Sequence, residues 1–310
     1  MKSGAIATRS EITTTCAIIV SYHPDELIVQ LTHALLQQVP QVVIVDNGSN
    51  AQSRARLQEL ARDDRVNLIW NSSNQGIATA LNQGVRFAQR NGFIWVATFD
   101  QDSQVNEGYF AALFGALDMT PLAAQIAILA PRYLDPRTGV TSAFEGQHHQ
   151  RSKRFVTLDV AMTSGNLVRC SAFEMVGMFW EELFVGYVDY EFCLRCRHHG
   201  LLIVGVTDAV LVHRPGNCVR RRFLWMNPVL SHYQPLRRYY NARNSVAVYR
   251  RHGLRRIRWM LSDMWELVRE TAKVALLEEQ KIPKLRAIFC GLLNGLAGRL
   301  GKVPDAGQCH

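Results

Sequence analysis

The sequence predicts an α/β protein in which helices flank a mostly parallel sheet and a helical extension follows at the C-terminal end. Two observations carry this prediction. In the first hundred residues, short apolar runs alternate with segments of helical period, and the connections between them are short. From residue 236 onward the helical period dominates. Because parallel strands joined by crossover helices give such an alternation, we expect a sheet domain over residues 1–250. A basic amphipathic helical region should then cover 251–310.

Apolar runs and helix breakers delimit the elements of the first hundred residues. Residues 42–45 read Val-Val-Ile-Val, which is typical of a strand buried on both faces. Leucines at positions 27, 31 and 35 repeat with the period of a helix, and Pro40 ends that helix. The expected strands are 16–20, 42–45, 66–70 and 93–98; the expected helices are 25–38, a segment carrying Leu57 and Leu60, and 76–89.

The later elements follow one another less regularly. The expected strands are 126–130, 160–168, 201–206 and 209–213, with a turn at 135–139, a basic loop at 147–154 and a helix at 189–199. Toward the C-terminal end, one helix face gathers apolar residues at positions 254, 257, 261, 264, 265, 268, 272 and 275. A similar stripe resumes after Pro283. Such a stripe either packs against the sheet domain or lies on a membrane surface.

Basic residues are concentrated in the last third of the chain. Residues 1–213 contain 16 Lys and Arg against 20 Asp and Glu, a net charge of −4. Residues 214–310 contain 19 against 6, a net charge of +13. This asymmetry indicates an anionic partner for that region: a phosphorylated ligand, an acidic membrane surface or a nucleic acid.

The cysteines and the apolar runs bear on the compartment. Seven cysteines form an odd number without regular spacing, as expected in a reducing environment. The sequence shows neither a secretory signal nor an apolar run long enough to span a bilayer. We therefore expect a cytoplasmic protein.

Polar side chains gather where the expected strands end. Asp100 and Asp102 follow the fourth strand, Asp46 ends the second, and Ser21 and Tyr22 end the first. Since the carboxyl ends of parallel strands border one crevice, we expect these side chains to meet there. Two carboxylates two residues apart repel each other unless a cation or a sugar hydroxyl shares the site. A carboxylate such as Asp46 can also accept the N3–H of a pyrimidine base.

Other motifs narrow the choice of ligand. Gly76 removes a side chain where a nucleotide could approach the positive end of the third helix. No G-x-G-x-x-G follows the first strand and no Walker motif is present, which disfavours dinucleotide and ATP binding. Cys193 and Cys196 with the neighbouring histidines resemble part of a zinc site. They lie in a helical stretch without a second ligand pair at finger spacing, so we expect Cys193 in the core.

Several stretches, taken in order, resemble the family 2 glycosyltransferases of the GT-A fold. They are Val-Ile-Val-Asp-Asn-Gly-Ser at 43–49, the two Asn-Gln-Gly segments within 74–84, and Asp-Gln-Asp-Ser at 100–103. Within that family the chain most resembles bacterial dTDP-rhamnosyltransferases, including the second rhamnosyltransferase of rhamnolipid synthesis and related O-antigen enzymes. The supporting stretches are 163–165, 181–184, 188–195 and 235–244. The resemblance covers about residue 16 to about residue 300, and its motifs are more specific for the family than for rhamnose.

This resemblance implies roles for individual acids. Asp46 matches the aspartate that binds the base, Asp100 matches the first acid of the D-x-D motif, and Asp102 matches the acid that ligates Mg²⁺ or Mn²⁺. His213 matches a family histidine near the diphosphate and the metal. A hard divalent cation held by oxygen ligands stabilises the negative charge that gathers on the leaving nucleoside diphosphate. A lone histidine at a strand end is otherwise more often structural.

Further residues are expected to bind the nucleotide sugar. Ser21, Tyr22, Asn74 and Gly76 face the same crevice if the strands are parallel. Arg243 and Asn244 match the family's R-x-x-R-N-like segment. Together with the arginines at 237 and 238, they are expected to close over the diphosphate, because guanidinium forks fit phosphate oxygens. For the arginines at 237 and 238, a solvated helix face is an equally good interpretation.

The catalytic base has two candidates. Asp189 aligns with the base in the family's E-D-x-D pattern, but here Val188 replaces the usual Glu and Glu191 replaces the last Asp. Residues two apart on a helix point about 200° away from each other, so only one of Asp189 and Glu191 can face the anomeric carbon. We favour Asp189. In the alternative interpretation both are acids that stabilise a helix N-terminus.

The resemblance implies an inverting transfer of L-rhamnose from dTDP-L-rhamnose to an acceptor hydroxyl. The acceptor is expected to be lipidic, such as mono-rhamnolipid, or a glycan. The basic stripe adds the hypothesis of peripheral contact with the inner face of the cytoplasmic membrane. A rival within the class is a family 2 transferase that uses another nucleotide sugar in O-antigen or polysaccharide synthesis. A rival outside it, a nucleic-acid-binding protein, is disfavoured because the acids at the crevice would repel phosphates without a metal.

Overall fold

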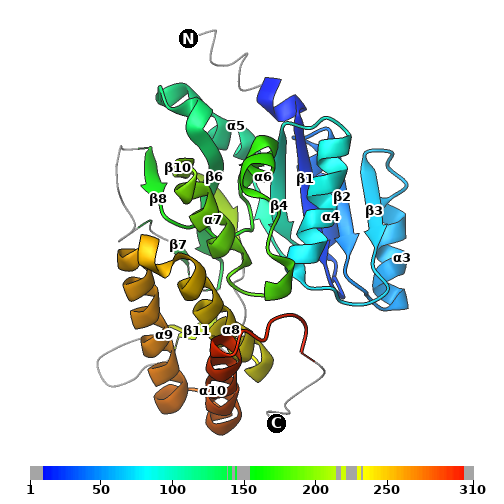
Figure 1. Cartoon of the computed structure of the whole chain (residues 1–310). Helices are drawn as coiled ribbons and strands as arrows, with labels where there is room; N and C mark the ends of the chain where they lie inside the picture. Colours follow the sequence, from blue (N-terminus) through cyan, green and yellow to red (C-terminus); the bar gives the residue numbers. More distant parts are fainter. Residues whose placement is uncertain are drawn as a thin grey trace.

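A computed structural model of the chain describes residues 10–137, 139–141, 144, 154–213, 218–220, 229–231 and 233–303. One mixed sheet lies between two layers of helices, and three long C-terminal helices pack below it (Figure 1). The strand order is β3-β2-β1-β4-β9-β6-β10-β5, with β7 paired to β6 and β8 paired to β10. The α/β architecture expected from the sequence is therefore confirmed.

The first half of the sheet is parallel. Its strands are β1 (Thr15–Ser21), β2 (Gln41–Asp46), β3 (Val66–Trp70) and β4 (Trp95–Asp100), and the connecting helices are α2 (Leu27–Leu36), α3 (Ala51–Leu60) and α4 (Ile77–Arg90). The apolar runs of β1, β2 and β4 are buried because helices cover both faces of the sheet. Helices α4, α6 (Cys170–Val176) and α7 (Val188–His198) pack on one face, and α2, α3 and α5 (Tyr109–Phe114) pack on the other. The strands and helices predicted for this half lie within two residues of the observed ones.

The second half of the sheet is mixed. Its strands are β5 (Gln104–Val105), β6 (Ile126–Asp135), β7 (Val140–Thr141), β8 (Phe155–Leu158), β9 (Leu167–Arg169) and β10 (Leu202–Val212). The short strands β11 (Cys218–Arg220) and β12 (Val229–Ser231) form a separate ribbon, and the one-turn 3-10 helices are η1 (Leu117–Met119), η2 (Ala123–Gln125), η3 (Glu181–Leu183) and η4 (Gly253–Arg255). Strand β9 is antiparallel to both β4 and β6, so residues just before β9 run past the carboxyl end of β4.

Two predictions for this half were wrong in detail. The stretch 160–168 is extended strand only from 167, because the N–H of Gly165, at φ +81°, bonds to the Thr98 carbonyl and turns the chain across the end of β4. The two strands expected at 201–206 and 209–213 are one strand, β10, which a register shift between Gly205 and Val210 interrupts without ending. Most of the loop predicted at 147–154 lies outside the described residues.

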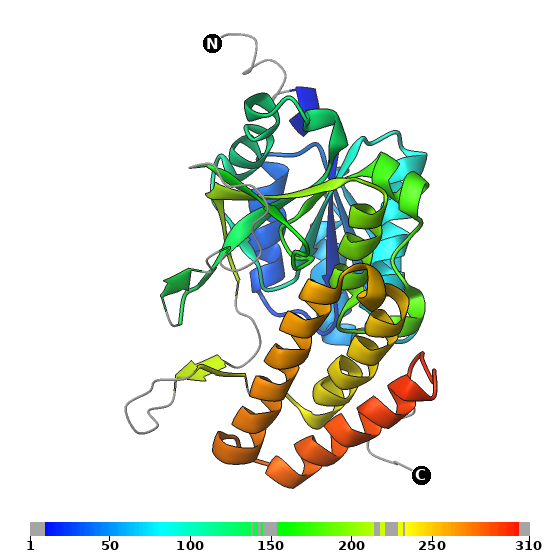
Figure 2. The same ribbon diagram turned by 60° about the vertical axis from the view of Figure 1, so that its left-hand side comes forward.

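Three helices complete the fold below the sheet (Figure 2). They are α8 (Pro235–His252), α9 (Ile257–Leu277) and α10 (Lys281–Leu296). Helix α10 crosses α8 closely because Gly291 and Gly295 face the α8 backbone. A Cβ at Gly291 would lie 2.4 Å from the carbonyl oxygen of Tyr239, and one at Gly295 would lie 2.5 Å from that of Arg243. Only glycine permits this approach.

A buried carboxylate links the same three helices. Glu278, just after α9, lies 2.6 Å from Arg238 of α8 and 2.8 Å from Lys284 of α10. All three side chains are at most 6 % exposed. Removing one partner of a buried ion pair leaves a charge without compensation, so Glu278 fixes the geometry of this helical unit.

The first of the two predicted apolar stripes, at 254–275, does not pack against the sheet domain. Leu254 is 95 % exposed, Leu261 56 % and Trp265 64 %. Instead, α9 turns its other side inward, where Trp259 and Val274 are buried. Among the described helices, none combines the length and the apolar character required to cross a bilayer.

Candidate active site

The carboxyl edge of the parallel strands carries the candidate site. Registered pairing places Ser21 of β1 beside Asp46 of β2, and Val20 of β1 beside Asp100 of β4. Helix α8 and the segment between η3 and α7 cover this edge. The edge is therefore the crevice that the alternation of strands and helices predicted.

Two adjoining cavities open at this edge. The first has a volume of about 560 Å³ and is lined by Val20, Ser21, Tyr22, Asn47, Asn74, Gly76, Ile77, Asp100, Gln101, Phe184, Val185, Tyr233, Gln234, Leu236, Arg237 and Tyr240. The second has a volume of about 430 Å³ and is lined by Ile77, Asp100, Asp102, Met162, Thr163, Ser164, Val185, Gly186, Val188, Asp189, His213, Tyr233 and Arg237. They share five lining residues, so one elongated ligand can occupy both; these are Ile77, Asp100, Val185, Tyr233 and Arg237.

Three side chains in the second cavity form a potential metal site. One oxygen each of Asp100 and Asp102 and one ring nitrogen of His213 all lie within 4.8 Å of one another. His213 Nε2 is 3.7 Å from Asp100 Oδ2, and His213 Nδ1 is 3.6 Å from Asp102 Oδ1. Two carboxylates and an imidazole suit a divalent cation such as Mn²⁺, and Mg²⁺ is also held by carboxylates. The donor set therefore fits the cation that the sequence predicted.

Neighbouring hydroxyl groups hold this cluster in place. Ser103 Oγ lies 2.8 Å from Ser164 Oγ and 3.4 Å from His213 Nδ1, and the N–H of Asp100 donates to Ser164 Oγ at 3.1 Å. Burial raises the pKa of Asp102, and the charge of Asp100 adds to the rise, while His213 opposes it. A bound cation would relieve that repulsion between the acids.

Asp189 lines the same cavity as this cluster. It lies in the first turn of α7, where its Oδ1 accepts the N–H of Tyr190 at 2.9 Å. Burial raises its pKa to about 6, although that hydrogen bond and the charge of Arg237 pull it down. A carboxylate with a pKa near 6 is a competent general base close to neutral pH.

Glu191, the second candidate for the base, faces away from the cavities. It is fully buried, and Arg195 Nε lies 2.9 and 2.8 Å from its two oxygens. His252 Nε2 is 3.1 Å from Oε1 and Arg251 is 3.5 Å from it. Burial alone would raise the pKa of Glu191, but the His252 hydrogen bond and the two arginine charges hold it below its usual value.

Asp46 is at the expected strand end but is completely buried. Its Oδ2 accepts the N–H of Ser49 at 3.1 Å and lies 3.4 Å from Arg54 Nε. Its Oδ1 has no hydrogen-bond partner among the described residues. Asp46 does not belong to the described lining of either cavity.

The Asn74–Gly76 turn lines the first cavity, but for a reason the sequence did not reveal. Asn74 Oδ1 accepts the N–H of Gly76 at 2.9 Å. A Cβ at Gly76 would lie 2.6 Å from the carbonyl oxygen of Phe184, and that carbonyl accepts the N–H of Ile77 at 2.7 Å. The protein itself thus occupies the space that the glycine leaves at this helix N-terminus, although we expected a nucleotide there.

Arg243 and Asn244 are also buried behind the cavities and outside their described lining. The Asn244 amide donates to the carbonyls of Leu183, Val185 and Gly186 at 2.8–2.9 Å. Arg243 donates to the carbonyls of residues 183 and 301 at 3.1 and 2.6 Å. Both side chains therefore fix the segment 183–186, which forms a wall of both cavities.

Sequence reasoning missed several lining residues. Phe184, Tyr233 and Tyr240 supply aromatic walls, and Phe184 and Tyr240 stack with ring centroids 5.2 Å apart. The chain after α10 returns to the first cavity, where Lys302 Nζ donates to the Asn74 carbonyl at 3.1 Å. The stretches 181–184 and 235–244 contain Phe184 and Tyr240, but the sequence does not mark these residues as lining, since each reaches the site through tertiary packing.

Known proteins resemble this chain in sequence and in fold. Residues 16–177 match the model of "Glycosyl transferase family 2". The dTDP-rhamnosyl transferase RfbF of Shigella flexneri is 29 % identical over 301 residues, which cover 92 % of this chain and 96 % of that protein. The low-salt glycan biosynthesis hexosyltransferase Agl10 of Haloferax volcanii is 25 % identical over 312 residues and 92 % of each chain.

Solved structures agree on the fold alone. TarS residues 1–349 from S. aureus, in complex with UDP-GlcNAc, superposes with a TM-score of 0.57 at 13 % identity, over 91 % of this chain and 81 % of that one. The mannosyltransferase PcManGT from Pyrobaculum calidifontis, in complex with GDP-Man and Mn²⁺, gives 0.54 at 15 % identity over 98 % and 85 %. The GT-A architecture is thereby confirmed. With its matching family model and its full-length relatives, the chain belongs to glycosyl transferase family 2 and is a glycosyltransferase.

Proposed function

We propose that this enzyme transfers L-rhamnose from dTDP-L-rhamnose to an acceptor hydroxyl with inversion at the anomeric carbon. One observation carries the proposal: a single cavity presents the Asp100–Asp102–His213 cluster and the Asp189 carboxylate together. An RfbF relative named as a dTDP-rhamnosyl transferase supports the choice of donor.

The two cavities divide the donor between them. The first, with Ser21, Tyr22 and Asn74 on its walls, takes the nucleoside, and the second takes the sugar. Arg237 lines both, so its guanidinium is placed for the diphosphate between them. The buried Asp46 oxygen without a partner is the acceptor that a pyrimidine N3–H would satisfy after local rearrangement.

Asp100, Asp102 and His213 would hold Mg²⁺ or Mn²⁺. That cation supplies positive charge next to the diphosphate as negative charge develops there. The acids alone would repel the donor. The carboxylate pair and its neighbouring imidazole therefore need the cation for donor binding.

Asp189 is the proposed general base. As the acceptor oxygen attacks the anomeric carbon, a new C–O bond forms, the bond to the diphosphate breaks, and the hydroxyl proton passes to Asp189. Glu191 is excluded from this role in the proposal because Arg195 and His252 occupy its oxygens.

Arg243 and Asn244 act in the proposal as positioning residues. Their hydrogen bonds hold residues 183–186 against the cavities, and Asp189 follows this segment in the chain. This supporting role takes the place of the direct contact with the diphosphate that the family resemblance implied for both residues.

The acceptor in this proposal is a lipid-linked or lipidic hydroxyl, such as that of mono-rhamnolipid, or a glycan. The enzyme would then work as a cytoplasmic protein in peripheral contact with the inner face of the membrane. The alternative is a transferase for another nucleotide sugar in O-antigen or polysaccharide synthesis, which the Agl10 relative, a glycan-biosynthesis hexosyltransferase, favours.

Purified enzyme tests the donor directly. It is incubated with Mn²⁺ or Mg²⁺, with dTDP-L-rhamnose, UDP-GlcNAc or GDP-mannose, and with lipid and glycan acceptors, and the products are read by mass spectrometry. We expect a mass gain of one deoxyhexose only with dTDP-L-rhamnose and only with the cation. Transfer from a UDP- or GDP-sugar in preference would support the alternative and overturn the donor assignment.

A further inference from the structure

Helix α9 presents an exposed apolar row to solvent. The row, here called the α9 face, consists of Ile257, Leu261, Met264, Trp265, Val268 and Leu276, which are 43–65 % exposed. The positions from 257 to 268 follow three- and four-residue spacing, and Leu276 comes eight residues later, so all six lie on one side of the helix. Large contiguous apolar patches are uncommon on free surfaces and mark places where another body docks.

The opposite side of α9 reaches the residues around the proposed base. Asp263 Oδ2 accepts the hydroxyl of Tyr187 at 2.7 Å and that of Tyr249 at 2.6 Å. The ring of Trp259 packs edge-on against Tyr190 at 6.2 Å between centroids. Tyr187 and Tyr190 flank Asp189 in the chain. The α9 face is therefore the outer side of the helix whose inner side supports the catalytic end of the cavity.

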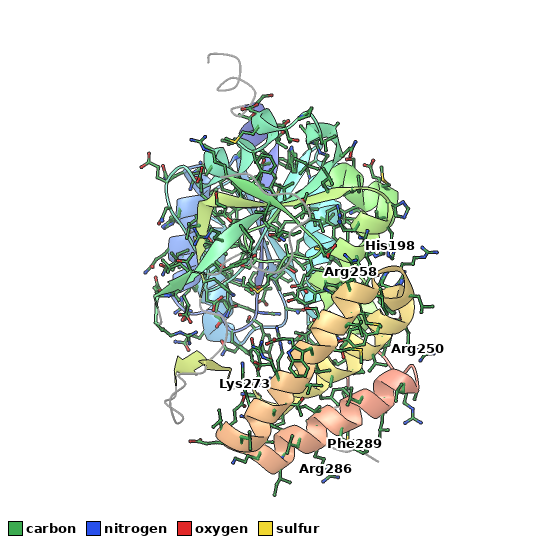
Figure 3. All side chains as sticks on the ribbon, turned by 90° about the vertical axis from the view of Figure 1, so that its left-hand side faces the viewer. His198, Arg250, Arg258, Lys273, Arg286 and Phe289 are labelled. Carbon is green, nitrogen blue, oxygen red and sulfur yellow. The ribbon has the colours of Figure 1, made fainter. Side chains whose placement is uncertain are left out.

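The three-helix region that carries the α9 face has a net positive charge, although α9 itself contains as many acidic as basic residues. Residues 233–303 contain 15 Lys and Arg against 5 Asp and Glu, a net charge of +10. Three of those acids, at positions 263, 270 and 278, are turned inward and have partners. Arg255 and Arg258, at the N-terminal end of the row, are exposed, and Figure 3 shows Arg258 at that end of α9. Farther along the helix, Arg269 and Lys273 are paired with Glu266 and Glu270. The positive charge beside the row therefore lies at its N-terminal end.

We infer that the α9 face docks on an anionic lipid bilayer. An apolar row with exposed arginines beside it matches the two parts of such a surface, since apolar side chains enter the acyl boundary and arginines bind the headgroups. A second copy of the chain fits less well, because two faces that each belong to a region of net charge +10 would repel each other. The inference specifies the membrane contact of the proposed function, and it rests on that function for its lipidic acceptor.

Helix α10 provides a matched comparison. It also exposes apolar side chains, including Phe289 at 61 % and Leu293 at 50 %. However, α10 packs on α8, and the chain that follows it leads to Asn74 on the nucleoside side of the site. Figure 3 places Phe289 and Arg286 on this separate helix. We assign the docking to α9 because its inner side contacts Tyr187 and Tyr190 beside the proposed base, and α10 variants serve as controls.

The test measures binding of the purified full-length chain to sedimented vesicles without donor. The vesicles contain either phosphatidylcholine alone or a mixture of about two parts phosphatidylcholine to about one part phosphatidylglycerol. We expect binding only to the anionic vesicles, weakened by salt. L261S/W265S should lower the partition coefficient at least about tenfold, by removing apolar contact. R255Q/R258Q should lower it about 25-fold, since each cation near an anionic surface contributes about a factor of five.

The control F289S/L293S should bind within about twofold of the wild type. The inference would be overturned if the α10 control lost as much vesicle binding as the α9 variant. It would also be overturned if the wild type did not bind anionic vesicles at low salt. So would sedimentation showing a dimer that L261S/W265S dissociates, which would assign the face to a second copy. Unchanged melting temperatures show that the variants are folded. Sugar transfer to a soluble acceptor is measured separately, so a wrong donor leaves the vesicle result intact.

Discussion

Replacing the proposed base separates chemistry from donor binding. Asp189→Asn keeps the size of the side chain, and its amide carbonyl can still accept the Tyr190 N–H. It removes the only proton acceptor that the proposal uses. A positioned general base contributes about 10²–10⁴-fold, so kcat should fall by that factor, equivalent to about 3–5 kcal/mol in the barrier. The Kd for the donor should change by less than about twofold, because Asp189 faces the sugar end of the cavity and contacts no phosphate in the proposal.

The pH profile adds a second readout from the same residue. With a pKa of about 6, Asp189 is about 97 % deprotonated at pH 7.5 and about 9 % at pH 5. Wild-type kcat should therefore be flat above about pH 7 and fall about tenfold at pH 5. The residual rate of Asp189→Asn should lack this acidic limb.

Folding stability should depend on pH in the opposite direction to kcat, because protonation of Asp189 stabilises the fold while it slows the reaction. An aspartate whose pKa is raised in the folded state binds protons more tightly there than in the unfolded chain. Its stabilising contribution is present below about pH 4 and is lost as the pH rises through about 6. Asp189→Asn should thus melt higher than the wild type at pH 7.5, with the difference shrinking at low pH.

The assays are steady-state transfer kinetics from pH 5 to 8, calorimetric donor binding and thermal unfolding. The reasoning fails if Asp189→Asn retains more than about a tenth of wild-type kcat. It fails equally if the acidic limb persists in the variant, because another group would then be titrating.

Three further variants probe the rest of the site and its support. Asp102→Asn should abolish Mn²⁺ binding measured by electron paramagnetic resonance. The Mn²⁺ affinity of the wild type should weaken on acidification, because the pKa of Asp102 is raised. An unaltered Mn²⁺ affinity in the variant would remove Asp102 from the set of metal ligands. Glu191→Ala should lower the free energy of unfolding in urea by about 3–5 kcal/mol, because it removes the only carboxylate paired with the largely buried Arg195 and leaves that charge with backbone carbonyl partners alone among the described residues. Full stability with lost turnover would instead make Glu191 the base. Gly291→Ala should lower the melting temperature by several degrees, since its Cβ would lie 2.4 Å from the Tyr239 carbonyl oxygen. This clash should outweigh a gain of about 1 kcal/mol in helix propensity. An unchanged melting temperature would mean that α10 can shift away from α8.

The parts of the fold governed by local pattern were predictable. The run at 42–45 is a strand covered on both faces, as its continuous β-branched residues indicated. The D-x-D acids lie at a carboxyl strand edge because four strands in sequence are parallel, which follows from their alternation with helices. The convergence of Asp100 and Asp102 with His213 rests on the position of β10 in the sheet, and only the family resemblance anticipated it.

Other parts depended on contacts that no local pattern records. Periodicity located the α9 stripe but could not tell whether protein or solvent covers it. Helix geometry showed that Asp189 and Glu191 diverge. Which of them meets the cavity depended on His252, which lies 61 residues after Glu191 in the sequence and bonds to that carboxylate. Likewise Arg243 reads as a phosphate-binding arginine until its partners, backbone carbonyls of the cavity wall, are known.

The return of the chain after α10 has a consequence for biosynthesis. Gly301 donates its N–H to the Glu182 carbonyl, and Val303 donates its N–H to the Tyr240 hydroxyl, so segments from distant parts of the sequence meet beside the first cavity. A nascent chain in which all strands of the sheet have been synthesised still lacks these hydrogen bonds of residues 301–303. Premature termination before residue 301 would thus yield a protein with ordered strands whose first cavity lacks these contacts.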